Sequence, residues 1–253
     1  MNKKICYLVA SILYIGMWSC EGNEPEPVYE RCLLTKYYSQ GDTSQSSINF
    51  FYDNNDRLVK MITPGPPGMV WGSNYIYGSN TITITDMASA NSYSRYYLRA
   101  DSLAYASVSY AQGVLFDTVT YFYNAEKYLI KTVRYNPVFG KDSSLFTYTD
   151  NNLQRIDTYQ SNGFVDYASF TYGNTPSKAW YYQNNTIYLP STNYYPWFGK
   201  GNTKLATSFS FTYNGNPQPV SISYTLNASG YIKSMQQTHL GNSSTLFFEY
   251  SCR

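Results

Sequence analysis

Residues 119–133 read VTYFYNAEKYLIKTV, and residues 48–62 repeat the pattern as INFFYDNNDRLVKMI. In both copies an aromatic-rich run ends in tyrosine, an Asn or Asp follows, and a leucine-led run begins six residues after that tyrosine. Asn and Asp accept hydrogen bonds from nearby backbone amides and tolerate left-handed dihedral angles, which suits them to tight turns. Each copy therefore predicts an antiparallel β-hairpin.

Related units recur along the rest of the chain at residues 144–156 and 224–235, with half-units at 168–173, 208–214 and 245–251. Within them, Phe209 and Phe211 alternate with Ser208, Ser210 and Thr212. Alternation with a period of two is the signal of a strand that is buried on one face. No segment after residue 30 shows a sustained helical period. We therefore expect a sheet with one packed face and one hydroxyl-rich face.

These hairpins predict an all-β fold, a long antiparallel meander of about a dozen or more strands curled into a barrel-like sheet, because a flat sheet would expose long edges. Cys32 and Cys252 stand near the two ends of this domain. Exported proteins form disulfides readily, so we expect these two cysteines to be bonded and the first and last strands to be neighbours. The alternative is a pair of free thiols.

The amino terminus has the format of an export signal. Residues 1–20 read MNKKICYLVASILYIGMWSC, which is two lysines, a short apolar run, a small residue and a cysteine. The apolar run is shorter than the ~20 residues that span a bilayer. Residues 17–20, MWSC, resemble a bacterial lipobox, although Met and Trp replace the usual residues. The alternative is an ordinary secretory peptide.

Three segments follow from this reading. Residues 1–19 are a lipoprotein signal peptide, residues 20–30 are a lipid anchor at Cys20 with an acidic, proline-containing spacer, and residues 31–253 are a single β domain of hairpin repeats. The signal holds two of the 18 basic residues, so the mature chain has 16 basic residues and 16 acidic residues. Nucleic-acid binding requires a concentrated basic stripe, and here the charges are scattered. We therefore expect no nucleic-acid partner.

The lipobox-like start, the segment Cys-Leu-Leu-Thr-Lys at residues 32–36 and the repeated Tyr-Asp/Asn units resemble a family of Bacteroidetes lipoproteins of unknown function with a porin-like β fold. The hairpins are also similar to the YD repeats of Rhs-type surface proteins. The resemblance implies a barrel held at the cell envelope, in the outer membrane at its periplasmic or outer face. It implies no catalytic or binding residue. Lysines within the hairpins and the Cys-Arg end argue against a transmembrane channel.

A second pattern, at residues 180–202 (WYYQNNTIYLPSTNYYPWFGKGN), interrupts the hairpin rhythm with eight aromatic side chains. Long loops in compact domains tend to be functional, and Tyr and Trp offer a flat face with a polar tip. We expect a ligand site in this loop, joined by Trp71 from the Pro/Gly-rich segment 63–72. The alternative is that the loop aromatics plug the barrel end as core. The predicted binding residues are Trp71, Trp180, Tyr181, Tyr182, Tyr194, Tyr195, Trp197 and Phe198.

The sequence contains few residue patterns that could carry catalysis. His239 is its only histidine, and no nucleophile motif accompanies it. The Asp53 to Asp56 run lacks the ligand spacing of a helix-loop-helix calcium site, so we interpret it as a hairpin turn. We predict no catalytic residue, no metal and no cofactor. A hydrolase built on two carboxylates is the weakest alternative.

Two triplets, DSL at residues 101–103 and DTV at residues 117–119, resemble the acceptor for O-glycosylation in Bacteroidetes, with Ser102 and Thr118 as the acceptors. Taken together, the sequence predicts a monomeric, non-enzymatic lipoprotein that is anchored to a membrane by its lipid. Its predicted role is to bind a glycan or an envelope protein through the aromatic loop. The alternative is a structural or interaction scaffold with no small ligand.

Overall fold

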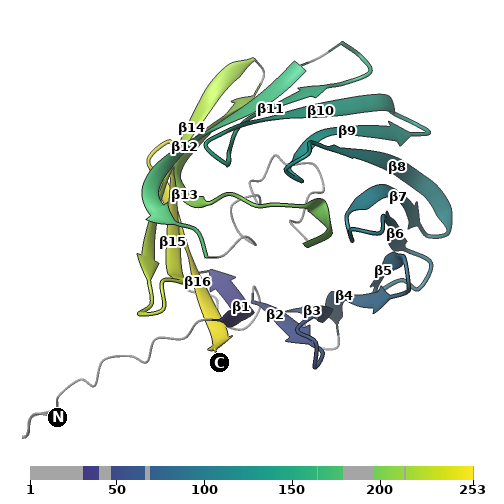
Figure 1. The fold of residues 1–253 in the computed structure, drawn as a ribbon, viewed down its shortest axis with the longest axis horizontal. Coiled ribbons are helices and arrows are strands. Elements are labelled where there is room, and N and C mark those ends of the chain that lie inside the picture. The colour runs from purple at the N-terminus through teal and green to yellow at the C-terminus, as the bar shows by residue number, and fades with distance from the viewer. Residues whose placement is uncertain are drawn as a thin grey trace, which may run out of the picture.

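The computed structural model describes residues 31–39, 47–65, 69–163, 165–178, 196–213 and 215–252. These residues form 16 antiparallel strands that close into one barrel, so the predicted all-β meander is confirmed (Figure 1). The segments at 1–30, which were assigned to the signal, the anchor at Cys20 and the spacer, lie outside the described residues. No helix in the described part of the chain is long and apolar enough to cross a membrane.

The strands follow one another around the barrel in chain order. Their bounds are β1 Cys32–Ser39, β2 Ile48–Tyr52, β3 Leu58–Pro64, β4 Val70–Tyr77, β5 Thr81–Asp86, β6 Tyr93–Leu98, β7 Ala104–Ala111, β8 Val114–Tyr123, β9 Leu129–Asn136, β10 Gly140–Thr149, β11 Asn152–Tyr159, β12 Val165–Pro176, β13 Lys204–Tyr213, β14 Asn216–Leu226, β15 Ile232–His239 and β16 Asn242–Cys252. A single 3-10 turn, η1 Pro196–Phe198, lies between β12 and β13.

The seam of the barrel joins the first strand to the last. Strand β1 pairs with β16 from Cys32 opposite Cys252 to Ser39 opposite Leu246. The two cysteines form a disulfide with a Cα–Cα distance of 4.0 Å. On its other side β1 pairs with β2, and between the described residues of these strands the pairs are Lys36 with Asn49 and Tyr37 with Ile48. The expected disulfide is therefore present at the point where the barrel closes.

Three of the repeated sequence units fold with one kind of turn. The amide of Asp53 donates to the carbonyl of Arg57 at 2.9 Å, and Asp53 Oδ1 accepts the amide of Arg57 at 3.0 Å. Asp56 has a positive φ of 60°, as expected for a three-residue hairpin loop with a bulge. The turns that begin at Asn124 and Asn227 repeat the same backbone and side-chain bonds. The Asp53 to Asp56 run is thus a hairpin turn, as predicted.

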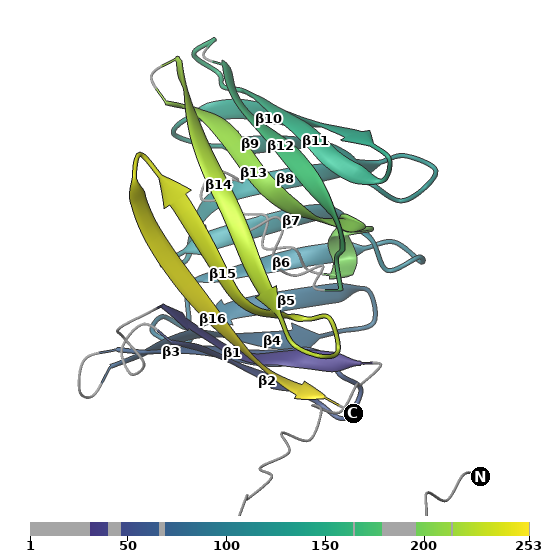
Figure 2. The same ribbon diagram turned by 90° about the vertical axis from the view of Figure 1, so that its left-hand side faces the viewer.

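Successive turns alternate between the two ends of the barrel, which is seen from the side in Figure 2. One end carries the disulfide and the turns β2–β3, β4–β5, β6–β7, β8–β9, β10–β11 and β14–β15, together with the β12–β13 connection. We call it the disulfide end. The other end, which carries the turns β3–β4, β5–β6, β7–β8, β9–β10, β11–β12, β13–β14 and β15–β16, is called the opposite end.

The barrel wall is largely apolar inside, and on β13–β15 its outer face is rich in hydroxyl groups. Phe209 and Val220 face each other in register and are buried, whereas the adjacent rung places Ser208 opposite Ser221 and Ser221 opposite Thr238. The inner face is lined by buried aromatic and aliphatic side chains. They include Leu34, Phe50, Tyr75, Ile82, Tyr96, Tyr121, Leu129, Phe146, Ile156, Phe170, Phe209, Phe211, Val220, Met235 and Phe248.

Replacing Cys252 with Ser should lower the free energy of unfolding, because the disulfide closes almost the whole domain into one loop. The chain-entropy model gives a loss of up to about 5 kcal/mol for a loop of this size. Urea unfolding of the wild type with and without reductant measures the same difference. Equal midpoints for the oxidised protein, the reduced protein and the Cys252→Ser variant would contradict this role.

Candidate functional site

The 3-10 turn η1, at residues 196–198, lies inside the barrel and fills part of its interior (Figure 1). In η1, Trp197 is 3% exposed and Phe198 is 1% exposed. The ring of Phe198 lies 5.0 Å from that of Tyr121 and 5.7 Å from that of Tyr96. The hydroxyl of Tyr123 donates to the carbonyl of Trp197 at 3.3 Å. We call residues 196–198 the plug, because they pack against the inside of β6 and β8.

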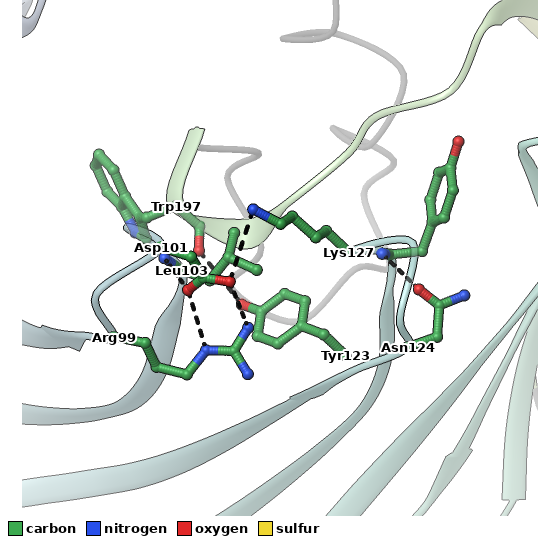
Figure 3. Close-up of polar contacts among 8 residues, drawn as sticks. Arg99, Asp101, Leu103, Tyr123, Asn124, Lys127 and Trp197 are labelled. Carbon is green, nitrogen blue, oxygen red and sulfur yellow. Dashed lines mark hydrogen bonds and ion pairs between the residues drawn. The ribbon is translucent and has the colours of Figure 1, made fainter.

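Charged turns at the disulfide end surround the plug (Figure 3). The guanidinium of Arg99 donates to both carboxylate oxygens of Asp101, at 3.2 and 3.1 Å, and lies over the ring of Tyr123. Lys127 Nζ lies 3.8 Å from the same carboxylate. These contacts hold the β6–β7 and β8–β9 turns together beside the plug.

The segment that follows the plug is fixed through its backbone. The amide of Lys200 donates to the carbonyl of Lys127 at 3.0 Å. A Cβ at Gly199, whose φ is +90°, would collide with that carbonyl, so the position requires glycine. Further along, the buried side chain of Asn202 accepts the amide of Leu153 at 2.7 Å. The plug is therefore attached to the barrel wall from both β8–β9 and β11.

A cavity of about 610 Å³ lies between the plug and the wall at the disulfide end. Strands β1–β6, β16 and the β14–β15 turn contribute to its lining. Its apolar surface comes from Leu34, Leu58, Ile82, Leu98, Pro196 and Trp197. A cavity of this size lies in the range of small-molecule sites.

Four tyrosines also line the cavity, and three of them make hydrogen bonds to the backbone. Tyr52 and Tyr77 donate to the carbonyls of Leu34 and Leu58, at 2.8 and 3.0 Å, and Tyr231 accepts the amide of Cys32 at 3.0 Å. Burial raises the pKa of Tyr77 to about 12. Burial is also the main cause that raises the pKa of Tyr52 and of Tyr250, the fourth tyrosine. The raised pKa keeps the phenols of Tyr52, Tyr77 and Tyr250 protonated at physiological pH.

Charged groups gather at the cavity as well. Arg31 pairs with Asp56 at 2.9 Å, and Arg57 pairs with Asp53 at 2.7 Å. Lys178 Nζ donates to the carbonyl of Ser229 at 2.7 Å. The lining therefore combines an apolar body with three cations.

The predicted aromatic site is only partly placed by the structure. Trp197 belongs to the plug and lines the cavity, and Phe198 is core. Trp71 is 50% exposed and lies in β4 near the opposite end, away from the plug. Trp180, Tyr181, Tyr182, Tyr194 and Tyr195 lie outside the described residues. The described members thus do not form a single cluster.

The other residues named from the sequence are the two predicted glycosylation acceptors and the histidine. Ser102 is exposed in the β6–β7 turn, and Thr118 is half-buried within β8, next to Asp117, which pairs with Arg134 at 2.9 Å. His239 Nε2 lies 3.3 Å from the amide oxygen of Gln218. Among the described residues, no three His, Cys, Asp or Glu side chains are grouped to hold a metal ion.

Sequence reasoning missed the cavity and its cations. The tyrosines that precede the turns of the repeat units include Tyr52, whereas Tyr77, which precedes the β4–β5 turn, lies outside the repeat units found in the sequence. The signal that could have found the site is their common position at the ends of β2 and β4, which places both phenols inside the same end of the barrel. Nothing in the local sequence shows that Lys178 and Arg31 lie beside them.

Replacing Phe198 with Ala should destabilise the barrel by about 3–5 kcal/mol, since a fully buried aromatic side chain leaves a void when it is truncated. Phe139→Ala is the matched control, because Phe139 is 67% exposed at the opposite end. Urea unfolding measures both. A loss for Phe198→Ala no larger than that for Phe139→Ala would show that the plug does not pack in the interior.

The free energy of unfolding should fall as pH rises from about 10 to 12. In the unfolded chain the phenol of Tyr77 loses its proton near 10, whereas in the folded barrel it does so at about 12. The unfolded state therefore binds fewer protons in this window, and Tyr52 and Tyr250 act in the same direction. Denaturant unfolding across this range checks the slope, and stability that stays level or increases would be inconsistent with buried phenols.

No family model matches the sequence, and no curated protein matches it. Among solved structures, the chain is similar to a porin-like protein from Bacteroides uniformis, with a TM-score of 0.67 and 17% identity over 86% of this chain and 96% of that chain. A porin-like protein from Bacteroides vulgatus aligns with a TM-score of 0.61 and 13% identity, over 86% of this chain and 98% of that chain. The chain therefore shares the porin-like barrel fold of these two Bacteroides proteins.

Proposed function

We propose that this protein is a non-enzymatic binding protein of the cell envelope that holds a small ligand in the cavity at the disulfide end. The observation that carries the proposal is the cavity of about 610 Å³ between the plug and the barrel wall. Its lining is predominantly apolar and aromatic with a few polar groups, which is the usual composition of a ligand site. The barrel is then a container for a ligand.

The distribution of polar groups supports a container over a transmembrane channel. Transmembrane barrels are apolar on the lipid-facing side and polar within. Here the inner face is apolar and holds the plug, and the outward rungs of β13–β16 are built from residues such as Ser208, Ser221, Thr238 and Ser243. A bilayer around these strands would have to bury hydroxyl-bearing side chains, and the transfer of hydroxyl groups from water to an apolar environment is unfavourable.

An envelope location is favoured by the porin-like neighbours and by the export signal. The lipobox-like sequence supports acylation at Cys20, and residues 21–30 would then connect the lipid to Arg31. Because the barrel begins at the disulfide end, this link would leave the molecule beside the cavity. Membership of a lipoprotein family is part of the same proposal.

A second candidate function is contact with a glycan or an envelope protein through the opposite end. Most large apolar side chains that are strongly exposed lie on its hairpins. They are Met69, Val70, Trp71, Val114, Leu115, Phe116, Tyr135, Val138, Phe139, Tyr159, Val165 and Leu240. Exposed apolar and aromatic groups of this kind mark interaction surfaces. Trp71 keeps its predicted role as a binding residue in this candidate.

The cavity proposal is tested with the neutral apolar dye Nile red. Ile82→Trp places a larger side chain in the cavity and should weaken dye binding at least about tenfold, since an indole occupies the space of the ligand. Leu240→Trp, at the opposite end, should leave binding unchanged. Circular dichroism confirms that both variants are folded. Equal affinities for the wild type and folded Ile82→Trp would disprove binding in the cavity.

The second candidate is tested by glycan-array and envelope pull-down experiments with the soluble domain. Trp71→Ser combined with Phe139→Ser should abolish any binding that uses the opposite end. Phe51→Ser, an exposed position on the outer face of β2, is the control. Binding that survives the double substitution would exclude this end as the interaction surface.

A further inference from the structure

We infer that the cavity at the disulfide end selects an anionic amphiphile, a molecule with an apolar body and one carboxylate or phosphate head group that Lys178 binds. This inference rests on the proposed function and names the class of its ligand. This ligand class differs from the glycan that the sequence analysis predicted.

The first argument is the balance of charge around the cavity. Arg31 and Arg57 each have a carboxylate partner, at 2.9 and 2.7 Å. Lys178 instead donates to a neutral acceptor, the carbonyl of Ser229, and in the described part of the chain no carboxylate lies within ion-pair distance of it. An ammonium group has three donors, so Lys178 retains the capacity to bind an anion.

The second argument is that two tyrosines, Tyr231 and Tyr250, follow one another along the cavity wall beside Lys178. Lys178 Nζ lies 5.6 Å from the centre of the Tyr231 ring, and that ring lies 5.3 Å from the ring of Tyr250. The hydroxyl of Tyr250 makes no hydrogen bond to any described residue. Since burial keeps this phenol protonated, it can donate to an acidic head group held by Lys178. Lys178 and Tyr250 thus both lie beside the Tyr231 ring, and the head-group site is placed at this side of the cavity.

The third argument favours an apolar body over a sugar for the part of the ligand that lies against the aliphatic wall. The hydroxyls of Tyr52, Tyr77 and Tyr231 line the cavity but already bond to backbone groups. The rest of the surface near them is aliphatic, from residues such as Leu34 and Ile82. Hydroxyl groups of a carbohydrate placed against this aliphatic part of the cavity would lose hydrogen bonds to water, whereas an acyl or aromatic body would gain from burial there.

The test is displacement of Nile red from the full soluble domain by four amphiphiles with the same chain: laurate, dodecyl phosphate, methyl laurate and dodecyltrimethylammonium. Laurate, dodecyl phosphate or both should bind at least about tenfold more tightly than the neutral ester and the cation, as expected for a charge-assisted hydrogen bond. Comparison of the first two identifies the head group.

Substitutions then assign the selectivity to the proposed residues. Lys178→Gln should weaken binding of the preferred anion about tenfold and leave methyl laurate unchanged. Tyr250→Phe, which removes the hydroxyl and keeps the ring, should weaken binding of the anion several-fold. Lys233→Gln removes an exposed lysine from β15 and should change nothing.

The outcomes separate this inference from the proposed function. Displacement by methyl laurate or dodecyltrimethylammonium as effective as by the anions, or an unchanged preference in Lys178→Gln, would overturn the anionic class while leaving the cavity as a binding site. Nile red binding that Ile82→Trp does not weaken would overturn the cavity itself. Displacement by an anion that depends on Lys178 supports both.

Discussion

The pairing of the first strand with the last, fixed by the Cys32–Cys252 disulfide, is the constraint on which the rest of the molecule depends. Among the described residues, strand β1 has two residue pairs with β2 and seven with β16, so β16 and the disulfide hold most of its length in the sheet. If this seam opened, both β1 and β16 would become unprotected edges. The cavity would lose part of its wall, because Cys32, Leu34 and Tyr250 belong to these strands.

The two ends of the barrel have different chemistry because their turns have different sequences. At the disulfide end, Asx-initiated turns bring charged residues such as Asp53, Arg57 and Lys127 to the rim. At the opposite end, the hairpin tips carry exposed side chains such as Val138 and Phe139. Ligand binding within one end and contact with a partner through the other are therefore compatible in a single molecule.

Much of the fold could be predicted from the sequence because short repeated segments each determine one hairpin. The alternation of Phe209 and Phe211 with Ser208 and Ser210 predicted a strand with one buried face, and the turn at Asp53 to Asp56 was predicted from its residue types. The disulfide was predicted from the positions of two cysteines in a chain expected to be exported. Each of these predictions depended only on the residues next to one another in the sequence or on the expected oxidising compartment. Each is confirmed in the described residues.

The candidate site could not be predicted in the same way, since it is assembled from distant segments. Lys178, Tyr231 and Tyr250 meet only after the barrel has closed. The aromatic residues of the β12–β13 segment were expected to bind a ligand or to fill the core. Trp197 and Phe198 are buried in the plug, and Trp197 also lines the cavity. Sequence identifies such residues by type, but only tertiary packing decides between core and site.

Amide hydrogen exchange measured by mass spectrometry tests the closed barrel most directly. If β1 is sealed against β16, peptides covering Cys32–Ser39 and Asn242–Cys252 should exchange as slowly as those from the wall strands β13 and β14. Rapid exchange in both segments of the oxidised protein, beside slow exchange in β13 and β14, would show an open sheet and would contradict the container on which the proposed function depends.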